Sequence, residues 1–219
     1  MRRPCLTALA VVCAALALAP STSAALTVPA ASLCIVPPVL TACPGGDIAY
    51  VVTIVDFSLS PLNNATVTLN FSGCPGFRLC TAGPAAPYTF VPPASIQAST
   101  DVHGQVVFWV RGGGTCASGI QVSVTPFGVS VPTLLTDGVN HDPVTLASPD
   151  QDGDLVVTSL DAAILAAKTA SDPTADLNGD GVHNAADEAL LAAHTGHVCP
   201  SLATPTTHGS WGGLKIIYR

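Results

Sequence analysis

Basic residues are scarce in this chain of 219 residues. It contains seven Lys and Arg against fourteen Asp and Glu, which gives a formal net charge of −7, and only 10% of its residues are charged. A chain with so few cations is not drawn to the phosphates of nucleic acids or to an anionic membrane surface. We therefore expect neither of these as a partner.

Recognisable catalytic motifs are also missing. The sequence has no G-x-S-x-G nucleophile elbow and no phosphate-binding P-loop. Glycoside hydrolases need two carboxylates at one site, but residues 26–147 contain a few scattered aspartates and no glutamate. We expect a protein that is not an enzyme.

Long apolar runs are confined to the start of the chain. Arg2 and Arg3 precede an apolar stretch at Leu6–Ala19, and small residues follow up to Ala25. This order is typical of a secretory signal peptide at residues 1–25. The alternative, a membrane anchor, is disfavoured because no stop-transfer pattern follows and no later segment reaches the length of a membrane span. We expect a secreted protein, extracellular or at the cell surface, with a net charge of about −9 once Arg2 and Arg3 are removed.

Six cysteines lie beyond the predicted signal peptide. In an exported chain an even number of cysteines predicts disulfides, and six allow fifteen pairings. Short closures such as Cys34–Cys43 or Cys74–Cys80 are among the candidates. A zinc site is the alternative, although paired C-x-x-C knuckles are lacking. The six are Cys34, Cys43, Cys74, Cys80, Cys116 and Cys199.

The first region after the signal, residues 26–147, is rich in Val, Thr, Pro and Gly. Apolar residues alternate along Ala65–Phe71, which places Val67, Leu69 and Phe71 on one face. Further strands are expected at Ile48–Val55, Gln105–Arg111 and Ile120–Val124, separated by turn-forming residues. Residues 80–99 contain four prolines and are expected to form a long loop. The pattern predicts an antiparallel β-sandwich.

Two segments of this region resemble the immunoglobulin-like domains of bacterial surface adhesins. Asp56, Pro61 and Val67 follow the spacing of a strand pair in that family, and Thr100–Phe108 matches its T-D-x-x-G-x-V-x-F segment. The resemblance implies an immunoglobulin-like fold. Independently of it, Asp101 and Gly104 suit a tight turn that leads into a strand.

Residues 148–199 form a second region with an internal repeat. Nine of the fourteen acidic residues lie between Asp150 and Glu188, and seven of them fall in two twelve-residue segments, 150–161 and 176–187, that start 26 positions apart. Each segment continues into a run of Ala and Leu. Calcium takes six to eight oxygen ligands, and a twelve-residue loop supplies them from positions 1, 3, 5, 7, 9 and 12. These positions are Asp150, Asp152, Asp154, the carbonyl of Val156, Thr158 and Asp161 in the first loop, and Asp176, Asn178, Asp180, the carbonyl of Val182, Asn184 and Asp187 in the second.

The tandem pattern, with Asp at position 12, resembles the dockerin domains of cellulosomal proteins. The resemblance implies two bound Ca²⁺ ions, a pair of short helices and a cohesin-like partner selected by positions 10 and 11 of each loop. These positions are Ser159-Leu160 and Ala185-Ala186 here.

The two loops depart from the pattern at different positions. Position 6 favours Gly because the loop turns sharply there. The second loop has Gly181, but the first has Leu155, so we expect weaker binding in loop one. The usually apolar position 8 is Val157 in loop one and His183 in loop two.

Each predicted helix is too short to be stable alone. We expect the two to pack together through Leu160, Ile164 and Leu165 on one and Leu190 and Leu191 on the other. His194 and His197 follow the second helix with H-x-x-H spacing, and with His183 they could form a zinc cluster. Without a third ligand of known geometry that pattern is weak.

The residues together predict a mainly β chain: a signal peptide (1–25), an immunoglobulin-like β-sandwich (26–147), a dockerin-like calcium module (148–199), and a linker with an apolar tail (200–219). The expected function is non-catalytic attachment or assembly outside the cell, with a cohesin-like domain or a surface polysaccharide as partner, in the context of polysaccharide breakdown. The alternative is a carbohydrate-binding module or an accessory part of a polysaccharide-degrading system, which would require exposed Trp or Tyr side chains.

Overall fold

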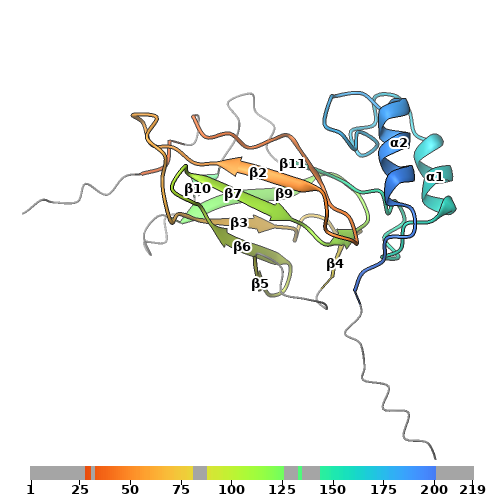
Figure 1. Ribbon diagram of the computed structural model, residues 1–219, viewed down its shortest axis with the longest axis horizontal. Coiled ribbons are helices and arrows are strands. Elements are labelled where there is room, and N and C mark those ends of the chain that lie inside the picture. The colour runs from red at the N-terminus through yellow and green to blue at the C-terminus, as the bar shows by residue number, and fades with distance from the viewer. Residues whose placement is uncertain (1–27, 31–32, 81–87, 126–132, 135–143, 201–219) are drawn as a thin grey trace, which may run out of the picture.

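A computed structural model describes residues 28–30, 33–80, 88–125, 133–134 and 144–200. The predicted signal peptide and the apolar tail lie outside the described residues. The protein is mainly β, with two short helices side by side at one end (Figure 1). The strands are β1 (Val39–Thr41), β2 (Ala49–Thr53), β3 (Thr66–Asn70), β4 (Arg78–Leu79), β5 (Thr89–Val91), β6 (Ser95–Ser99), β7 (Gln105–Trp109), β8 (Gly112–Gly113), β9 (Cys116–Thr125), β10 (Thr133–Leu134) and β11 (Val144–Ala147), and the helices are α1 (Ser159–Ala166) and α2 (Ala185–His194).

The main sheet has the strand order β1-β11-β9-β3-β6-β5, with β10 also paired to β9. Its pairs are antiparallel except for β1 and β11, which run parallel. The alternating segment around β3 is confirmed as a strand with one buried face, because Val67 and Leu69 are fully buried and Phe71 nearly so.

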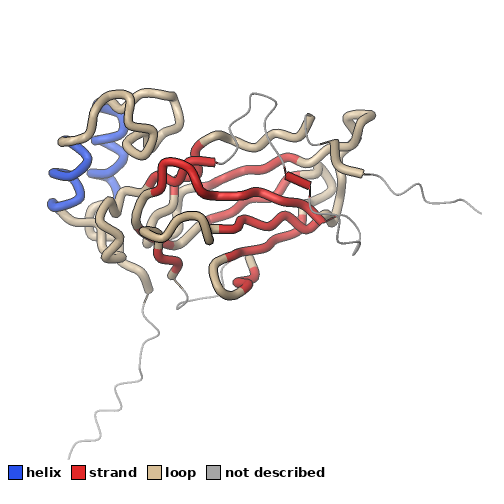
Figure 2. The backbone as a smooth tube through the Cα atoms, turned by 180° about the vertical axis from the view of Figure 1, so that it is seen from behind, coloured by secondary structure: helices blue, strands red, loops and turns tan. Residues whose placement is uncertain are grey.

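A second layer consists of β2 and β7, which pair antiparallel and lie over the main sheet (Figure 2). Both strands alternate between buried and exposed residues. Tyr50, Val52, Val106 and Phe108 point inward and share one hydrophobic core with β3, β6 and β9. Burial of such side chains contributes roughly 1.5–3 kcal/mol each, so this shared core holds the two layers together.

The prediction of a long loop at residues 80–99 was wrong for its second half. β5 and β6 occupy it and extend the main sheet beyond β3. A cis peptide bond between Pro92 and Pro93 lies in the turn between them. Pro92 and Pro93 therefore lie in a turn between two strands and not in an irregular stretch, a distinction that composition alone does not reveal.

Two disulfides join segments that are distant in sequence. Cys74 is bonded to Cys116 and Cys80 to Cys199, with sequence separations of 42 and 119. The short closures Cys34–Cys43 and Cys74–Cys80 do not form; Cys34 and Cys43 are free and buried. The second disulfide ties the end of the helical region to the edge strand β4.

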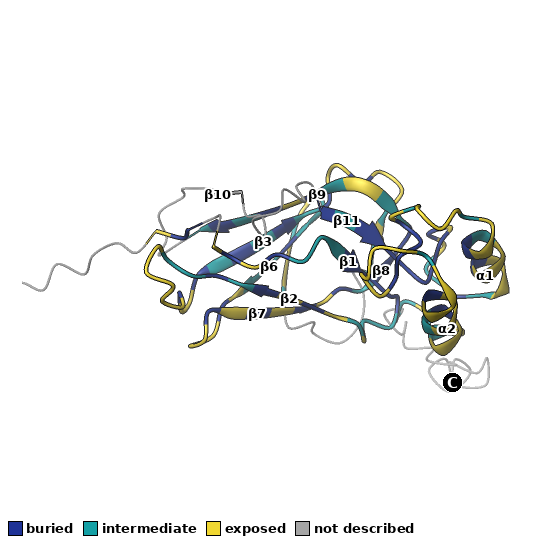
Figure 3. Ribbon diagram, turned by 90° about the horizontal axis from the view of Figure 1, so that it is seen from above, coloured by how far each residue is buried: buried dark blue, intermediate teal, exposed yellow. Residues whose placement is uncertain are grey.

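The helices pack over a small second core (Figure 3). Leu165 and Leu191 are buried in it with Val157 and Leu177, and Ala147 of β11 also contributes. Leu160, expected on the packed face, is 57% exposed. It lies in the first turn of α1, where the apolar spacing does not match the face that meets α2. Within the described residues, no helix has the length and apolar character needed to cross a membrane.

Candidate metal centre

The two acidic segments fold into loops with the same internal hydrogen bonds. Asp150 and Asp176, at position 1, each accept one backbone N–H from position 4 and one from position 6. The distances are 2.8 and 2.7 Å for Asp150, and 2.7 and 2.8 Å for Asp176. Positions 3 and 5 also follow one pattern, since each accepts the N–H two residues further on. The sequence repeat is therefore also a structural repeat.

The aspartate at position 12 accepts hydrogen bonds from the start of each loop and from position 9. Asp161 Oδ1 accepts the N–H groups of Gln151 and Asp152, at 2.7 and 3.3 Å, and its Oδ2 accepts from the N–H and hydroxyl of Thr158. Asp187 Oδ1 accepts the N–H groups of Leu177 and Asn178, and its Oδ2 accepts the N–H of Asn184. Both carboxylates are fully buried. Because each is also the third residue of a helix, it links the start of the loop to the helix.

The position-9 residues are helix N-caps. Thr158 and Asn184 have extended backbones, and each forms a capping box with the aspartate three residues later. An N-cap with its reciprocal partner typically stabilises a helix by about 1 kcal/mol. Both helices therefore begin at position 10, so that the last three residues of each loop form the first turn of its helix.

The backbone at position 6 is left-handed in both loops. Gly181 has φ of 92°, and Leu155 has φ of 74° although it is not a glycine. A left-handed conformation costs a residue with a Cβ roughly 1–2 kcal/mol. Leu155 is held there by three bonds: its N–H donates to Asp150, its carbonyl accepts from Cys199 N, and Cys199 is cross-linked to Cys80.

Loop one has the stronger set of carboxylates. Oxygens of Asp150, Asp152 and Asp161 lie within 4.8 Å of one another. Calcium–oxygen bonds of about 2.3–2.6 Å allow three ligand oxygens at such separations around one ion. Burial, together with the nearby charges of Asp161 and Asp154, raises the pKa of Asp150 to about 6. A bound cation would relieve this crowding of like charges.

Loop two has the same geometry with two amides in its ligand positions. The Nδ2 atoms of Asn178 and Asn184 lie 3.0 and 3.1 Å from Asp180 Oδ2, and these bonds lower the pKa of Asp180. The Oδ1 atoms of Asn178 and Asn184 accept the N–H groups of Asp180 and Ala186, at 2.9 and 2.8 Å. A carbonyl oxygen has a second lone pair, so each Oδ1 can bind a cation while it keeps its N–H bond. The residues therefore fit a calcium ion.

Both loops contact the β structure, loop one through Asp150 and loop two at its start, where Thr41 Oγ1 of β1 donates to Leu177 O at 2.8 Å. Gly114 N donates to the carbonyl of Asp150 at 2.8 Å, and a Cβ at Gly113 would collide with Asp150 Oδ2. The triple glycine after Arg111 suggests a turn in sequence, but it forms β8 and its end, which leaves room for the loop. Sequence reasoning missed this role because nothing local links residues 112–114 to Asp150.

Each loop is closed by the segment that follows the helix of the other repeat. Around position 8 of loop one, Val157 N donates to His197 O and Gly196 N to Val157 O, both at 2.8 Å, after α2. At position 8 of loop two, His183 N donates to Ala170 O at 2.9 Å, after α1. The two repeats therefore interlock, and neither loop is complete without both helices.

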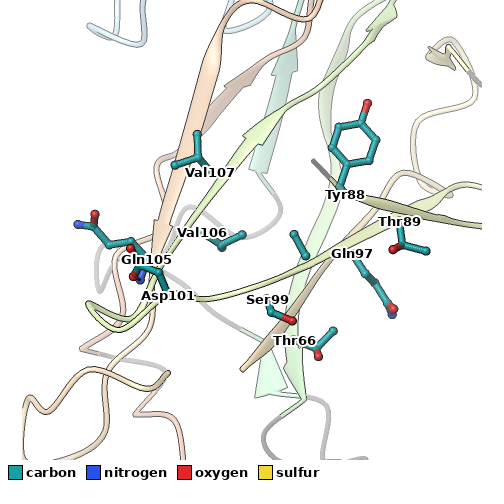
Figure 4. Close-up of a pocket in the computed structure, with 10 residues that line it drawn as sticks. Thr66, Tyr88, Thr89, Gln97, Ser99, Asp101, Gln105, Val106 and Val107 are labelled. Carbon is teal, nitrogen blue, oxygen red and sulfur yellow. Dashed lines mark hydrogen bonds between the residues drawn. The ribbon is translucent and has the colours of Figure 1, made fainter. Parts of the chain in front are cut away.

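A polar groove of about 660 Å³ lies on the β structure, away from the loops (Figure 4). It is lined by residues of β3, β5, β6 and β7 and their turns, among them Tyr88, Gln97 and Asp101. Tyr88 is half-buried, and its hydroxyl accepts a hydrogen bond from Arg111 N at 3.2 Å. The ring is therefore not an open platform of the kind that stacks on sugars.

No family model, no curated protein and no solved structure is similar enough to this chain to count as a match.

Proposed function

We propose that this chain is an exported, non-catalytic calcium-binding protein, in which residues 148–199 bind two Ca²⁺ ions and serve attachment or assembly outside the cell. The observation that carries the proposal is the repeated hydrogen-bond pattern of the two loops. Buried carboxylates at positions 1 and 12 frame exposed oxygen ligands at positions 3 and 5. When bound, the ions supply positive charge that neutralises the clustered aspartates.

The dockerin-like assignment has structural support in the interlocked repeats. Each loop leads into a short capped helix, and the two helices pack together around Leu165 and Leu191. The partner-selecting positions of the resemblance, Ser159-Leu160 and Ala185-Ala186, are all exposed at the helix starts. They are available to a cohesin-like domain, and Leu160 is the largest apolar side chain among them.

The immunoglobulin-like assignment is supported by the topology. One layer pairs β2 with β7, and the other runs β11-β9-β3, extended by β6 and β5. This order parallels the B–E pair and the G-F-C sheet of immunoglobulin domains, whereas the two added strands lie in the order β6-β5, with the later strand next to β3. In this scheme the body acts as a rigid carrier that presents the calcium module at one end.

Calorimetric titration of calcium into the chelator-treated exported protein tests the function. We expect two bound ions per chain. Asp152→Ala should abolish calcium binding in loop one, and Asp180→Ala should abolish it in loop two. Both aspartates are exposed proposed ligands, so their loss should affect ion binding more than folding. Glu188→Gln, an exposed acid outside the ligand positions, is the matched control and should keep both. Absence of binding at millimolar calcium would refute the proposal.

The assembly role needs a separate test. Capture of a cohesin-like domain by the immobilised protein should require calcium and weaken in Leu160→Asp, while retention in chelator would contradict calcium-dependent assembly. The second candidate, a carbohydrate-binding function, would rest on the polar groove, which is open to solvent and could hold a sugar by hydrogen bonds and not by stacking on Tyr88. Binding of soluble plant-cell-wall oligosaccharides that is lost in Gln97→Ala and unaffected by chelator would support that alternative.

A further inference from the structure

Four side chains with metal-binding atoms meet where the helical end joins the β structure. Cys43 and Asp47 come from the connection between β1 and β2, and His194 and His197 come from the end of α2 and the turn after it. Their sulfur, nitrogen and oxygen ligand atoms all lie within 4.8 Å of one another. The H-x-x-H pair lacked further ligands in the sequence, and the fold supplies two from residues about 150 positions away. His183 is not a member of this cluster.

The separations match the edges of a tetrahedral site. Cys43 Sγ lies 3.4 Å from His197 Nδ1, and Asp47 Oδ2 lies 3.3 Å from His194 Nε2 and 3.5 Å from His197 Nδ1. Zinc bonds of about 2.0–2.1 Å to nitrogen and 2.3 Å to sulfur place neighbouring ligands of a tetrahedron roughly 3.3–3.8 Å apart. The two imidazole rings are edge-on, with an angle of 85° between their planes, so that their nitrogens converge from different directions.

The tautomer of His194 is fixed by its other nitrogen. His194 Nδ1 lies 2.7 Å from the carbonyl oxygen of Leu190, one turn back in α2, and a carbonyl can only accept. Nδ1 therefore carries a proton, and in a neutral ring Nε2 presents its lone pair toward Asp47 Oδ2. Two acceptors 3.3 Å apart repel each other unless a proton or a metal ion lies between them. Histidines that bind metals commonly donate their second N–H to a carbonyl in this way.

The turn around Cys43 is shaped for the cluster. Gly46 N donates to the carbonyl of Cys43 at 2.9 Å, which closes a tight turn. A Cβ at Gly45 would lie 2.8 Å from His197 Nδ1, so the glycine gives the ring room to approach. Cys43 is fully buried and has no disulfide partner, in a protein whose other described cysteines, apart from Cys34, are paired.

We propose that Cys43, Asp47, His194 and His197 bind one zinc ion, which clamps the calcium module to the β structure. The donor set of one sulfur, two nitrogens and one oxygen suits zinc, whereas calcium takes oxygen alone. The site is therefore chemically distinct from the two acidic loops. Since the carbonyl of His197 accepts from Val157 N, the zinc ion also fixes the segment that closes loop one.

Metal titration of the chelator-treated exported protein, with calcium kept saturating so that the acidic loops are filled, tests the proposal. We expect one zinc ion per chain in competition with a chromogenic chelator. Cobalt in its place should give the intense visible bands of a tetrahedral centre and a thiolate-to-cobalt charge-transfer band. Cys43→Ser should remove that band, and Cys43→Ser and His197→Ala should each weaken binding about 100-fold or more.

Two matched variants serve as controls. Cys34→Ser removes the other free buried thiol, and His183→Ala removes a histidine of the same module. Both should bind zinc like the parent. Asp47 is 45% exposed, so Asp47→Ala tests the site even where Cys43→Ser fails to fold. Absence of binding at micromolar zinc, cobalt spectra without the thiolate band, or parental affinity in His197→Ala and Asp47→Ala would overturn the proposal.

Discussion

Leu155 and Gly181 occupy the same position of the two loops and share a left-handed backbone, with φ of 74° and 92°. Leu155 is part of a loop docked on the β structure, whereas no atom lies within 4 Å of a Cβ placed on Gly181. The strain at Leu155 is thus borne by the surrounding fold before any ion binds, which removes the basis for expecting weaker binding in loop one.

Substitutions at these two positions should have different consequences for calcium. Leu155→Gly should leave the affinity of loop one within about 3-fold, because the loop is already formed. Gly181→Ala should weaken loop two about 5- to 30-fold, the equivalent of the roughly 1–2 kcal/mol that a Cβ costs in this conformation. Site-resolved calcium titration checks both, and a stronger loss in Leu155→Gly than in Gly181→Ala would contradict the argument.

Substitutions of Asp152 and Asp161 should distinguish the effect of calcium ligation from the effect on folding. Asp161 accepts four hydrogen bonds while fully buried, so Asp161→Ala should lower the free energy of unfolding by about 2–4 kcal/mol even in EGTA. Asp152 is exposed and accepts one bond, so Asp152→Ala should change stability in EGTA by less than about 1 kcal/mol while abolishing calcium binding in loop one. Urea unfolding with and without calcium measures both effects. Equal losses in EGTA would show that position 12 is not a folding centre.

The Cys80–Cys199 disulfide should support loop one as well as the fold. Cys199 N donates to Leu155 O, so cutting the cross-link frees the segment that holds the strained residue. We expect Cys80→Ser with Cys199→Ser to lose about 2–4 kcal/mol of stability and to weaken calcium binding in loop one. Cys74→Ser with Cys116→Ser is the matched control. It should lose a similar amount of stability but reduce the calcium affinity of loop one less, since Cys74 and Cys116 lie two residues from the glycines that contact the loop, whereas Cys199 N is bonded to Leu155 itself.

Asp150 should give the metal-free protein a distinctive pH dependence. Burial raises the pKa of its carboxyl to about 6, against an ordinary value of 3.8. A raised pKa means that the folded state prefers the protonated acid. The stabilising contribution is therefore complete below pH 4 and is lost as the pH rises through about 6. In EGTA, the stability of the parent relative to Asp150→Asn should fall between pH 4.5 and pH 7. A difference that stays constant over this range would show that Asp150 is not buried as described.

The sequence predicted the local features well. Alternation located β2, β3, β7 and much of β9, and the twelve-residue spacing located both loops and the helices that follow them. These features depend on residues close together in the chain. In contrast, the parallel pairing of β1 with β11 and the disulfide partners depend on contacts between distant segments.

The interface between the two regions was not predictable for the same reason. Gly113 and Gly114 support Asp150, and Cys43 and Asp47 meet His194 and His197, but no periodicity relates these positions. The left-handed Leu155 was also unexpected, because the bonds that hold it come from Asp150 and Cys199 and not from its own propensity.

The most direct test of calcium binding follows the backbone amides of Leu155 and Gly181 by nuclear magnetic resonance as calcium is added to the chelator-treated protein. Each amide donates to the position-1 carboxylate of its loop, at 2.7 and 2.8 Å, so it reports on a proposed ligand of each ion. The proposal predicts that both resonances shift and saturate as two ions bind, and that Asp152→Ala abolishes the shift of Leu155 alone. Resonances that stay fixed in millimolar calcium would contradict it.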